Sequence, residues 1–139
     1  MSLKLQKSPP NSCLPTAFAI ACDCNVDDFI KETRAIGNVR IWDELPYPYC
    51  YRGWHMQECI MAAWRLGYST TIFMPEVYLG PDSEHLTKIK TKMVFDKRMV
   101  LLNNKHAVAC DGEKIYDPKG YIYDYVNQDW QMFCLIYKI

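Results

Sequence analysis

Cys13 stands where a thiol can be chemically reactive. It lies between the polar pair Asn11-Ser12 and the apolar run "LPTAFAIA" (14–21), so it opens a predicted helix. A thiol at a helix N-terminus lies in the positive end of the helix dipole, which lowers its pKa and favours the thiolate. The N–H groups of the first turn can also stabilise the oxyanion that forms when a thiolate attacks a carbonyl group. Cys13 is therefore a candidate nucleophile.

A candidate base and its orienting acid lie in a predicted β-hairpin, "KHAVACDGEKIYDP" (105–118). An Asp-Gly pair favours a two-residue turn, and a turn at Asp111-Gly112 places His106 directly opposite Asp117. Directly opposed Cβ atoms are about 4.5–5.5 Å apart, so the two side chains can meet. A carboxylate that accepts the Nδ1–H fixes the tautomer and leaves Nε2 free as a base. We expect Asp117 to bond to the ring nitrogen that faces away from the thiol.

Each of these three residues also has an ordinary structural interpretation. Cys13 could fill the core, and a strand histidine such as His106 commonly pairs with its neighbours at a partly exposed position. Asp117 precedes a proline, and Asp-Pro is a common turn dipeptide. A nucleophile needs a nearby base, and the base needs an orienting group. The three residues together therefore favour catalysis more than each does alone.

The use of cysteine favours free thiols in a reducing compartment. The count of seven is odd, and the residues after Met1 contain no apolar segment typical of a secretory signal. No CxxC pair occurs, and the nearest approaches to a metal motif are Cys22-Asp23-Cys24 and His55 with Cys59. We expect a cytoplasmic protein without a structural disulfide, bound zinc or another cofactor. A small metal-binding protein remains a separate functional class.

Length and charge limit the other classes. The 139 residues suit a single domain, 1–139, and half of them are hydrophobic, which supplies a core. Sixteen basic residues balance sixteen acidic ones without a basic cluster, so we expect no nucleic-acid or anionic-membrane partner. No stretch approaches the roughly 18 apolar residues of a membrane span. The oligomeric state stays open.

Three helices are predicted in the first half of the chain. The first is apolar on every side, as expected of a helix in the middle of a domain. Asn25 caps the second, and a glycine closes both the second and the third. An aromatic, proline-rich segment, 41–54, is predicted to be a long ordered loop, and its aromatic part, 47–54, lines either a substrate cleft or the core. The expected helices run from Cys13 or Leu14 to Ala21 or Cys22, from Asn25 to Gly37, and from Trp54 to Leu66.

Short β-rich runs dominate the second half of the chain. Asn103-Asn104, Asp111-Gly112 and Lys119-Gly120 separate them and favour hairpins. Helices followed by an antiparallel meander make an α+β domain, in which we expect the Cys13 helix to be buried against the sheet. The expected strands are 68–74, 98–102, 106–110, 114–118, 121–125 and 131–139.

Two segments carry a family resemblance. "NSCLPTAFAIA" (11–21) and "HAVACDGEKIYDP" (106–118) resemble the papain-like cysteine peptidases, most closely the bacteriocin-processing, double-glycine-peptidase-like branch, relatives of which occur in bacteria and phages. The resemblance covers about residues 5–25 and 98–125. It implies a papain-like fold, with N-terminal helices packed on a C-terminal antiparallel sheet, and a peptidase that cleaves a peptide or isopeptide bond in a peptide or protein substrate.

The resemblance also implies a role for each site residue. Cys13 would form the acyl-enzyme, His106 would act as general base and then acid, and Asp117 would orient the imidazole. The family places an oxyanion-stabilising Gln upstream of the cysteine, usually by six residues. Gln6 stands seven residues upstream and is the candidate. Asn11 or the Cys13 backbone N–H could serve instead.

The same three residues support other chemistry. Transglutaminase-like acyl transfer and glutamine deamidation use the same thiol-bound acyl group and differ in its acceptor. A non-catalytic binding module that keeps the scaffold is a further class, which the reactivity of Cys13 would distinguish. If the protein is phage-encoded, the expected location is the host cytoplasm.

Overall fold

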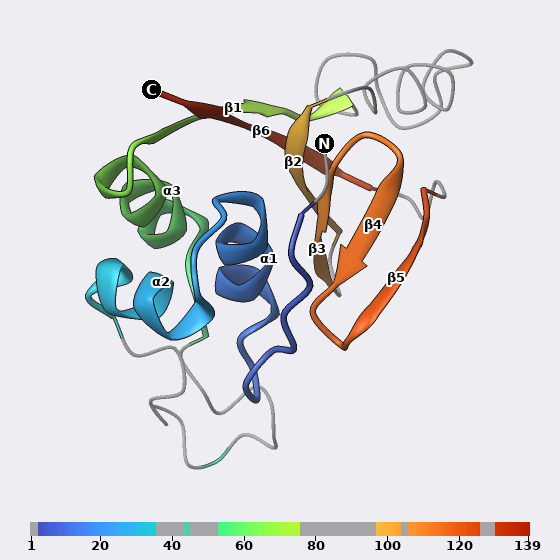
Figure 1. Ribbon diagram of the computed structural model, residues 1–139. Coiled ribbons are helices and arrows are strands. Elements are labelled where there is room, and N and C mark those ends of the chain that lie inside the picture. Colours follow the sequence, from blue (N-terminus) through green and yellow to red (C-terminus); the bar gives the residue numbers. More distant parts are fainter. Residues whose placement is uncertain (1–2, 36–43, 45–52, 76–96, 104–105, 126–129) are drawn as a thin grey trace.

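The computed structural model describes residues 3–35, 44, 53–75, 97–103, 106–125 and 130–139. Within them the chain forms the predicted α+β structure, with helices on one face of an antiparallel sheet (Figure 1). None of the helices described is long and apolar enough to span a membrane. The elements are α1 (Cys13–Ala21), α2 (Val26–Thr33), α3 (Met56–Arg65), β1 (Tyr68–Phe73), β2 (Arg98–Leu102), β3 (Ala107–Cys110), β4 (Lys114–Asp117), β5 (Tyr121–Asp124) and β6 (Met132–Lys138).

Helix α1 lies at the centre of the fold. Every residue from Pro15 to Ala21 is buried, which confirms the prediction of a helix that is apolar on all sides. Strands β2, β3 and β4 pack against α1, and so do α2 and α3. Pro15 is tolerated because N–H groups in a first turn have no partner within the helix. The N-terminal end, with the half-buried Cys13, is the part of α1 that reaches the surface.

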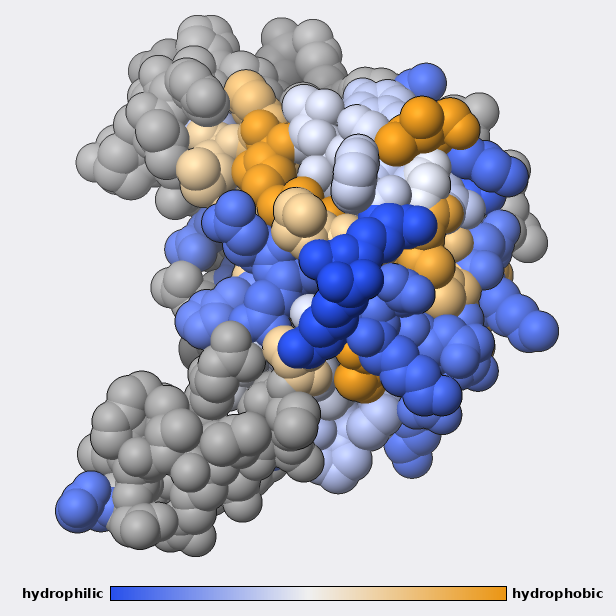
Figure 2. Space-filling view, turned by 90° about the vertical axis from the view of Figure 1, so that its left-hand side faces the viewer, coloured by the Kyte–Doolittle hydropathy of each residue, from blue (hydrophilic) through white to orange (hydrophobic). Residues whose placement is uncertain are grey.

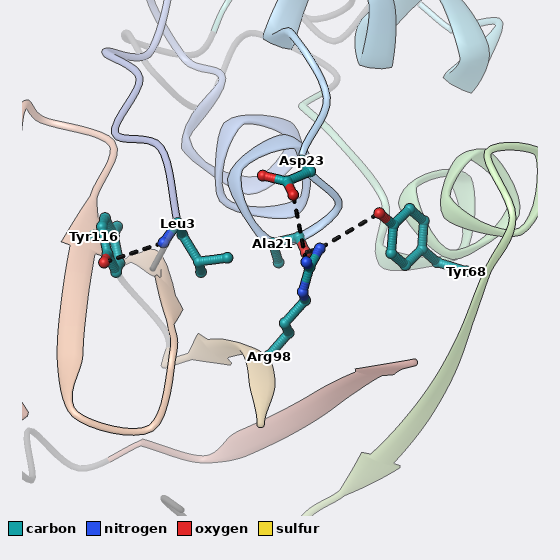
Figure 3. A network of polar contacts seen from close by, with 6 residues as sticks. All are labelled: Leu3, Ala21, Asp23, Tyr68, Arg98 and Tyr116. Atoms are coloured by element: carbon teal, nitrogen blue, oxygen red, sulfur yellow. Dashed lines mark hydrogen bonds and ion pairs between the residues drawn. The ribbon is translucent and has the colours of Figure 1, made fainter. Parts of the chain in front are cut away.

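Arg98 of β2 holds the C-terminal end of α1 (Figure 3). Its guanidinium donates to the Ala21 carbonyl oxygen at 3.2 Å and to the Tyr68 hydroxyl at 3.4 Å, and it forms an ion pair with Asp23 at 3.3 Å. The negative end of the helix dipole favours a cation at this position. These contacts fix where α1 ends on the sheet, and the rigid helix then determines where its first turn lies.

The segment before α1 runs beside the β3–β4 hairpin (Figure 3). The Leu3 N–H donates to the Tyr116 hydroxyl at 3.2 Å, and the Ser8 N–H donates to the Pro118 carbonyl oxygen at 2.7 Å. The Tyr116 hydroxyl in turn donates to Asp111 Oδ2 at 2.9 Å. Residues from the two halves of the sequence are therefore joined directly at this place.

Helix α2 begins as predicted and ends earlier. Asn25 caps it, since the Asn25 Oδ1 accepts a hydrogen bond from the Asp27 N–H at 2.9 Å. The helix ends before the predicted stop because Arg34 adopts a left-handed conformation, with φ of 57°. The predicted stop, Gly37, and most of the predicted loop 41–54 lie outside the described residues.

Helices α2 and α3 cover the core as amphipathic helices. Figure 2 shows the side of the molecule on which they lie, and this surface is mostly hydrophilic with separate hydrophobic patches. Their buried residues belong to the same hydrophobic cluster as α1, which is the pattern expected of helices that cover a core. These buried residues include Val26 and Phe29 of α2 and Cys59, Ala62 and Ala63 of α3.

The sheet has the strand order β1-β6-β2-β3-β4-β5. The predicted meander is present from β2 to β5, where consecutive strands pair. The prediction missed the return of β6, which pairs with β2 on one side and with β1 on the other. Such a return has no local turn signal in the sequence. The strand bounds agree with the predicted ones within one residue.

The β3–β4 pairing differs from the prediction. Cys110 lies opposite Ile115, whereas a two-residue turn would place it opposite Glu113. The reason is Asp111, because its Oδ1 accepts the N–H groups of both Glu113 and Lys114 at 2.9 Å and so holds a wider loop. A shift of two residues keeps every side chain on its original face of the sheet.

Tyr116→Phe should destabilise the fold, because it removes the hydroxyl that accepts the Leu3 N–H and donates to Asp111. Loss of a buried hydrogen bond to a charged group costs about 1.5–3 kcal/mol, which urea unfolding would measure as a lower midpoint. Tyr121→Phe is the matched control, since Tyr121 is 63% exposed and should change stability by less than about 0.5 kcal/mol. Equal losses in the two variants would contradict this role for the Tyr116 hydroxyl.

Candidate active site

Cys13 is the first residue of α1, and its thiol meets the start of β3. The His106 imidazole and the backbone N–H groups of Ala107 and Leu14 lie near the sulfur and lower the pKa of the thiol. Leu14 contributes from the first turn of the helix, and Ala107 contributes from the strand. The structure thus brings the predicted nucleophile and the predicted base together.

A reciprocal pair of hydrogen bonds fixes the backbone at His106. The His106 N–H donates to Asn103 Oδ1 at 2.9 Å, and the Asn103 N–H donates to the His106 carbonyl oxygen at 3.0 Å. Sequence reasoning identified Asn103 only as a turn residue. Its side chain also determines where His106 enters β3, and so it positions the imidazole.

Asp117, at the end of β4, is buried, and both of its carboxylate oxygens accept hydrogen bonds. Oδ1 lies 2.7 Å from His106 Nε2 and accepts the Lys119 N–H at 2.9 Å, while Oδ2 accepts the Tyr123 hydroxyl at 3.2 Å. Sequence reasoning missed Tyr123. The β4–β5 hairpin could have indicated Tyr123 as a partner of Asp117, because Tyr121 pairs with Asp117 and Tyr123 lies two residues farther along, on the same face.

The two ring nitrogens of His106 exchange the roles that were predicted for them. Asp117 bonds to Nε2, so the nitrogen left for the thiol of Cys13 is Nδ1. The observed pairing places Asp117 diagonally to His106, and diagonal neighbours on a sheet are about 7–8 Å apart. The outer nitrogen, Nε2, spans this longer gap. The prediction that Asp117 bonds to the nitrogen facing away from the thiol agrees with this arrangement, whereas the assignment of that nitrogen as Nδ1 was wrong.

The surroundings of the Cys13 thiol and the His106 imidazole move their pKa values in opposite directions. Burial is the largest influence on the Cys13 pKa and raises it, but the hydrogen bonds of the sulfur to His106 and to two backbone N–H groups together hold that pKa below its usual value of 9.0. The hydrogen bond to Cys13 is the largest influence on the His106 pKa. With the Asp117 carboxylate it holds this pKa above its usual value of 6.5 despite burial. Both shifts favour the thiolate–imidazolium pair.

Gln6 lies at the other end of α1. Its Nε2 donates to the Cys24 carbonyl oxygen at 2.7 Å, and its Oε1 accepts the Val26 N–H at 2.8 Å. Both partners follow the C-terminal end of a nine-residue helix that begins at Cys13, and such a helix is about 13 Å long. The expectation that Gln6 approaches the Cys13 sulfur is therefore corrected, because its amide joins α1 to α2 instead.

A pocket opens beside Cys13 and His106. Its volume is about 410 Å³, in the range of small-molecule and peptide sites. One wall comes from the segment before α1 and the other from the turn after β4. Asn11 lies in the first of these walls with a left-handed backbone, φ 57°. The described lining residues are Lys7, Ser8, Asn11, Ser12, Cys13, His106, Pro118 and Lys119.

The other described cysteines have the opposite character to Cys13. Burial raises the pKa of each of them, to about 12 for Cys22 and Cys134 and to about 11 for Cys110. The six described cysteines are unbridged, and Cys50 lies outside the described residues. No group of three side chains that could hold a metal ion occurs in the part of the chain that the structure describes.

Cys13 should react with iodoacetamide faster than the other cysteines near neutral pH, because only the thiolate attacks and only its pKa is lowered among those described. The rate should rise with pH through a value below 9.0. In His106→Ala this rise should move to higher pH, since burial is then opposed only by backbone N–H groups. Timed labelling followed by peptide mass spectrometry would measure the profiles. An identical Cys13 profile in the two proteins would contradict the assigned contact.

Comparisons with known proteins give no information about this site. No family model matches the chain, and no curated protein or solved structure matches it either. The α+β class is what the structure shows, and the papain-like fold implied by the resemblance stays a prediction.

Proposed function

We propose that this protein is a cysteine peptidase with a papain-like fold, which cleaves a peptide or isopeptide bond through an acyl-enzyme at Cys13. The observation that supports the proposal is that Cys13 and His106 line one pocket and shift each other's pKa, while His106 Nε2 lies 2.7 Å from the buried Asp117 carboxylate. A nucleophile, a base and an orienting acid in direct contact are the parts that nucleophilic catalysis requires. The adjoining pocket offers room for the substrate.

The proposed reaction has two halves. The Cys13 thiolate attacks the carbonyl carbon, and the resulting tetrahedral oxyanion collapses to a thioester as the C–N bond breaks. The His106 imidazolium gives its Nδ1 proton to the departing amine. The neutral imidazole then takes a proton from water, the hydroxide attacks the thioester, and the C–S bond breaks to release the acid product and restore the Cys13 thiolate beside the imidazolium. Asp117 keeps its bond to Nε2 in both halves and stabilises the imidazolium.

The oxyanion needs donors other than Gln6. Pro15 has no N–H, and the Leu14 N–H acts on the sulfur, whose pKa it lowers, so the Cys13 N–H is the first-turn donor left for the oxyanion. Asn11 lines the same pocket. We therefore assign the oxyanion site to the Cys13 N–H and the Asn11 carboxamide.

A reducing cytoplasm is the proposed location, that of the host if the protein is phage-encoded. A catalytic thiol has to stay reduced, and such compartments keep thiols reduced. The unbridged state of the six described cysteines is compatible with this location. The proposed substrate is a peptide or a protein.

The central experiment exposes a diverse mixture of synthetic peptides to the wild type and to Cys13→Ala, and identifies the products by mass spectrometry. The wild type should create new peptide termini, and Cys13→Ala should create none while unfolding at the same urea concentration. His106→Gln should cleave roughly 10²–10⁴ times more slowly, the usual contribution of a general base.

The products also separate the alternative functions. Deamidated glutamine or peptide–amine adducts without new termini would indicate acyl transfer or deamidation at the same thiol. No product of any kind, with Cys13 no more reactive than the buried cysteines, would contradict the enzyme and leave a binding module.

Asn11→Gly should slow cleavage by about 10²–10³-fold, the loss expected when one oxyanion donor is removed. Glycine accepts the left-handed backbone of Asn11, so the substitution removes the carboxamide without strain. Gln6→Ala is the matched control and should lower the urea midpoint while leaving kcat nearly unchanged, because Gln6 joins α1 to α2. The reverse result, with kcat lost in Gln6→Ala and kept in Asn11→Gly, would return the oxyanion role to Gln6.

A further inference from the structure

Two lysines stand together at the rim of the Cys13 pocket. Lys7 comes from the segment before α1, and Lys119 comes from the turn between β4 and β5. The hydrogen bond from the Ser8 N–H to the Pro118 oxygen, 2.7 Å, joins the two segments directly beside these lysines. A methyl group built on Gly120 would lie 4.0 Å from Lys7 Cγ and Cδ, so the Lys7 stem packs over this turn.

Among the described residues that line this pocket, no carboxylate balances the charge of the two lysines. Lys7 and Lys119 are exposed, and the other described lining residues include no Asp or Glu. Among the described residues neither ammonium group has a carboxylate partner, whereas Lys114, elsewhere on the same hairpin, pairs with Asp124 at 3.1 Å. The whole chain has equal numbers of acidic and basic residues, so an excess of positive charge at one pocket is a local feature.

We propose that Lys7 and Lys119 select substrates that carry a carboxylate within a few residues of the bond to be cleaved. This inference rests on the proposed peptidase function. An ammonium group at an exposed rim attracts a carboxylate mainly by steering its approach and fixing its register, and salt weakens the attraction. Two such contacts together favour an acidic substrate over its neutral equivalent by roughly three- to tenfold.

The carboxylate of the substrate can come from two sources, and the lysines would attract either one in the same way. It can be the side chain of an Asp or Glu near the scissile bond, or the C-terminal carboxylate of a short peptide. A set of peptidyl acyloxymethyl ketones, which alkylate a catalytic cysteine, tests the side-chain source on the acyl side of the bond. Glu replaces Gln at one position at a time in this set. A second set of ordinary peptides, with either a free or an amidated C-terminus, tests the leaving side by cleavage.

The second-order rate of Cys13 labelling is measured for the wild type, for the double variant Lys7→Gln/Lys119→Gln, and for Lys138→Gln. Lys138 is exposed in β6 and does not line the pocket, so it is the matched control for lost charge. The wild type and Lys138→Gln should prefer one acidic probe or the free C-terminus three- to tenfold, and added salt should reduce the preference. The double variant should lose it, and Lys7→Glu/Lys119→Glu should prefer a basic probe.

Iodoacetamide separates the role of the lysines from the reactivity of Cys13, because it is small and uncharged. All lysine variants should react with it at the wild-type rate. Normal iodoacetamide and probe labelling without any preference for the carboxylate would overturn the role of the lysines and leave the peptidase intact. A Cys13 that reacts with neither reagent would overturn both.

Discussion

The burial of α1 is the constraint on which the rest of the structure depends. A helix that is apolar on every side has to be covered on every side, and here β2, β3 and β4 share this task with α2 and α3. One end of such a helix can still reach the surface, and Cys13 occupies that end. The same packing that removes the helix from water therefore places its first turn against the start of β3, where the imidazole lies.

The polar contacts divide into those that hold the helix and those that hold the site. Arg98 of β2 donates to the Ala21 carbonyl oxygen, which the end of α1 leaves without a helical partner, and Gln6 bonds to Cys24 and Val26, where the chain passes from α1 to α2. Asn103, Tyr123 and the Lys119 N–H act at the other end, where they fix the backbone of His106 and the carboxylate of Asp117. Burial raises the Tyr123 pKa to about 12, so its hydroxyl stays a donor at any physiological pH.

The sequence allowed much of this arrangement to be predicted. The start of α1, the strand bounds and the side-by-side position of His106 and Asp117 follow from hydrophobic pattern and turn residues, which are local. The predicted pairing was wrong by two residues, yet a shift by an even number keeps the face, so the two side chains still meet. The wider loop could not be foreseen, because it depends on how the Asp111 side chain competes for backbone N–H groups. The return of β6 and the position of Gln6 depend on tertiary packing, for which the sequence has no local signal.

The distance along the chain between the parts of the site has a consequence for the protein during its synthesis. The thiol at residue 13 leaves the ribosome long before His106 and Asp117 do, and the Leu3 to Tyr116 bond joins residues 113 positions apart. Until the hairpin is made, Cys13 lacks the imidazole and the Ala107 N–H that lower its pKa. A nascent chain therefore carries a Cys13 thiol with an ordinary pKa, and that pKa is lowered only when the last third of the polypeptide has folded onto the first.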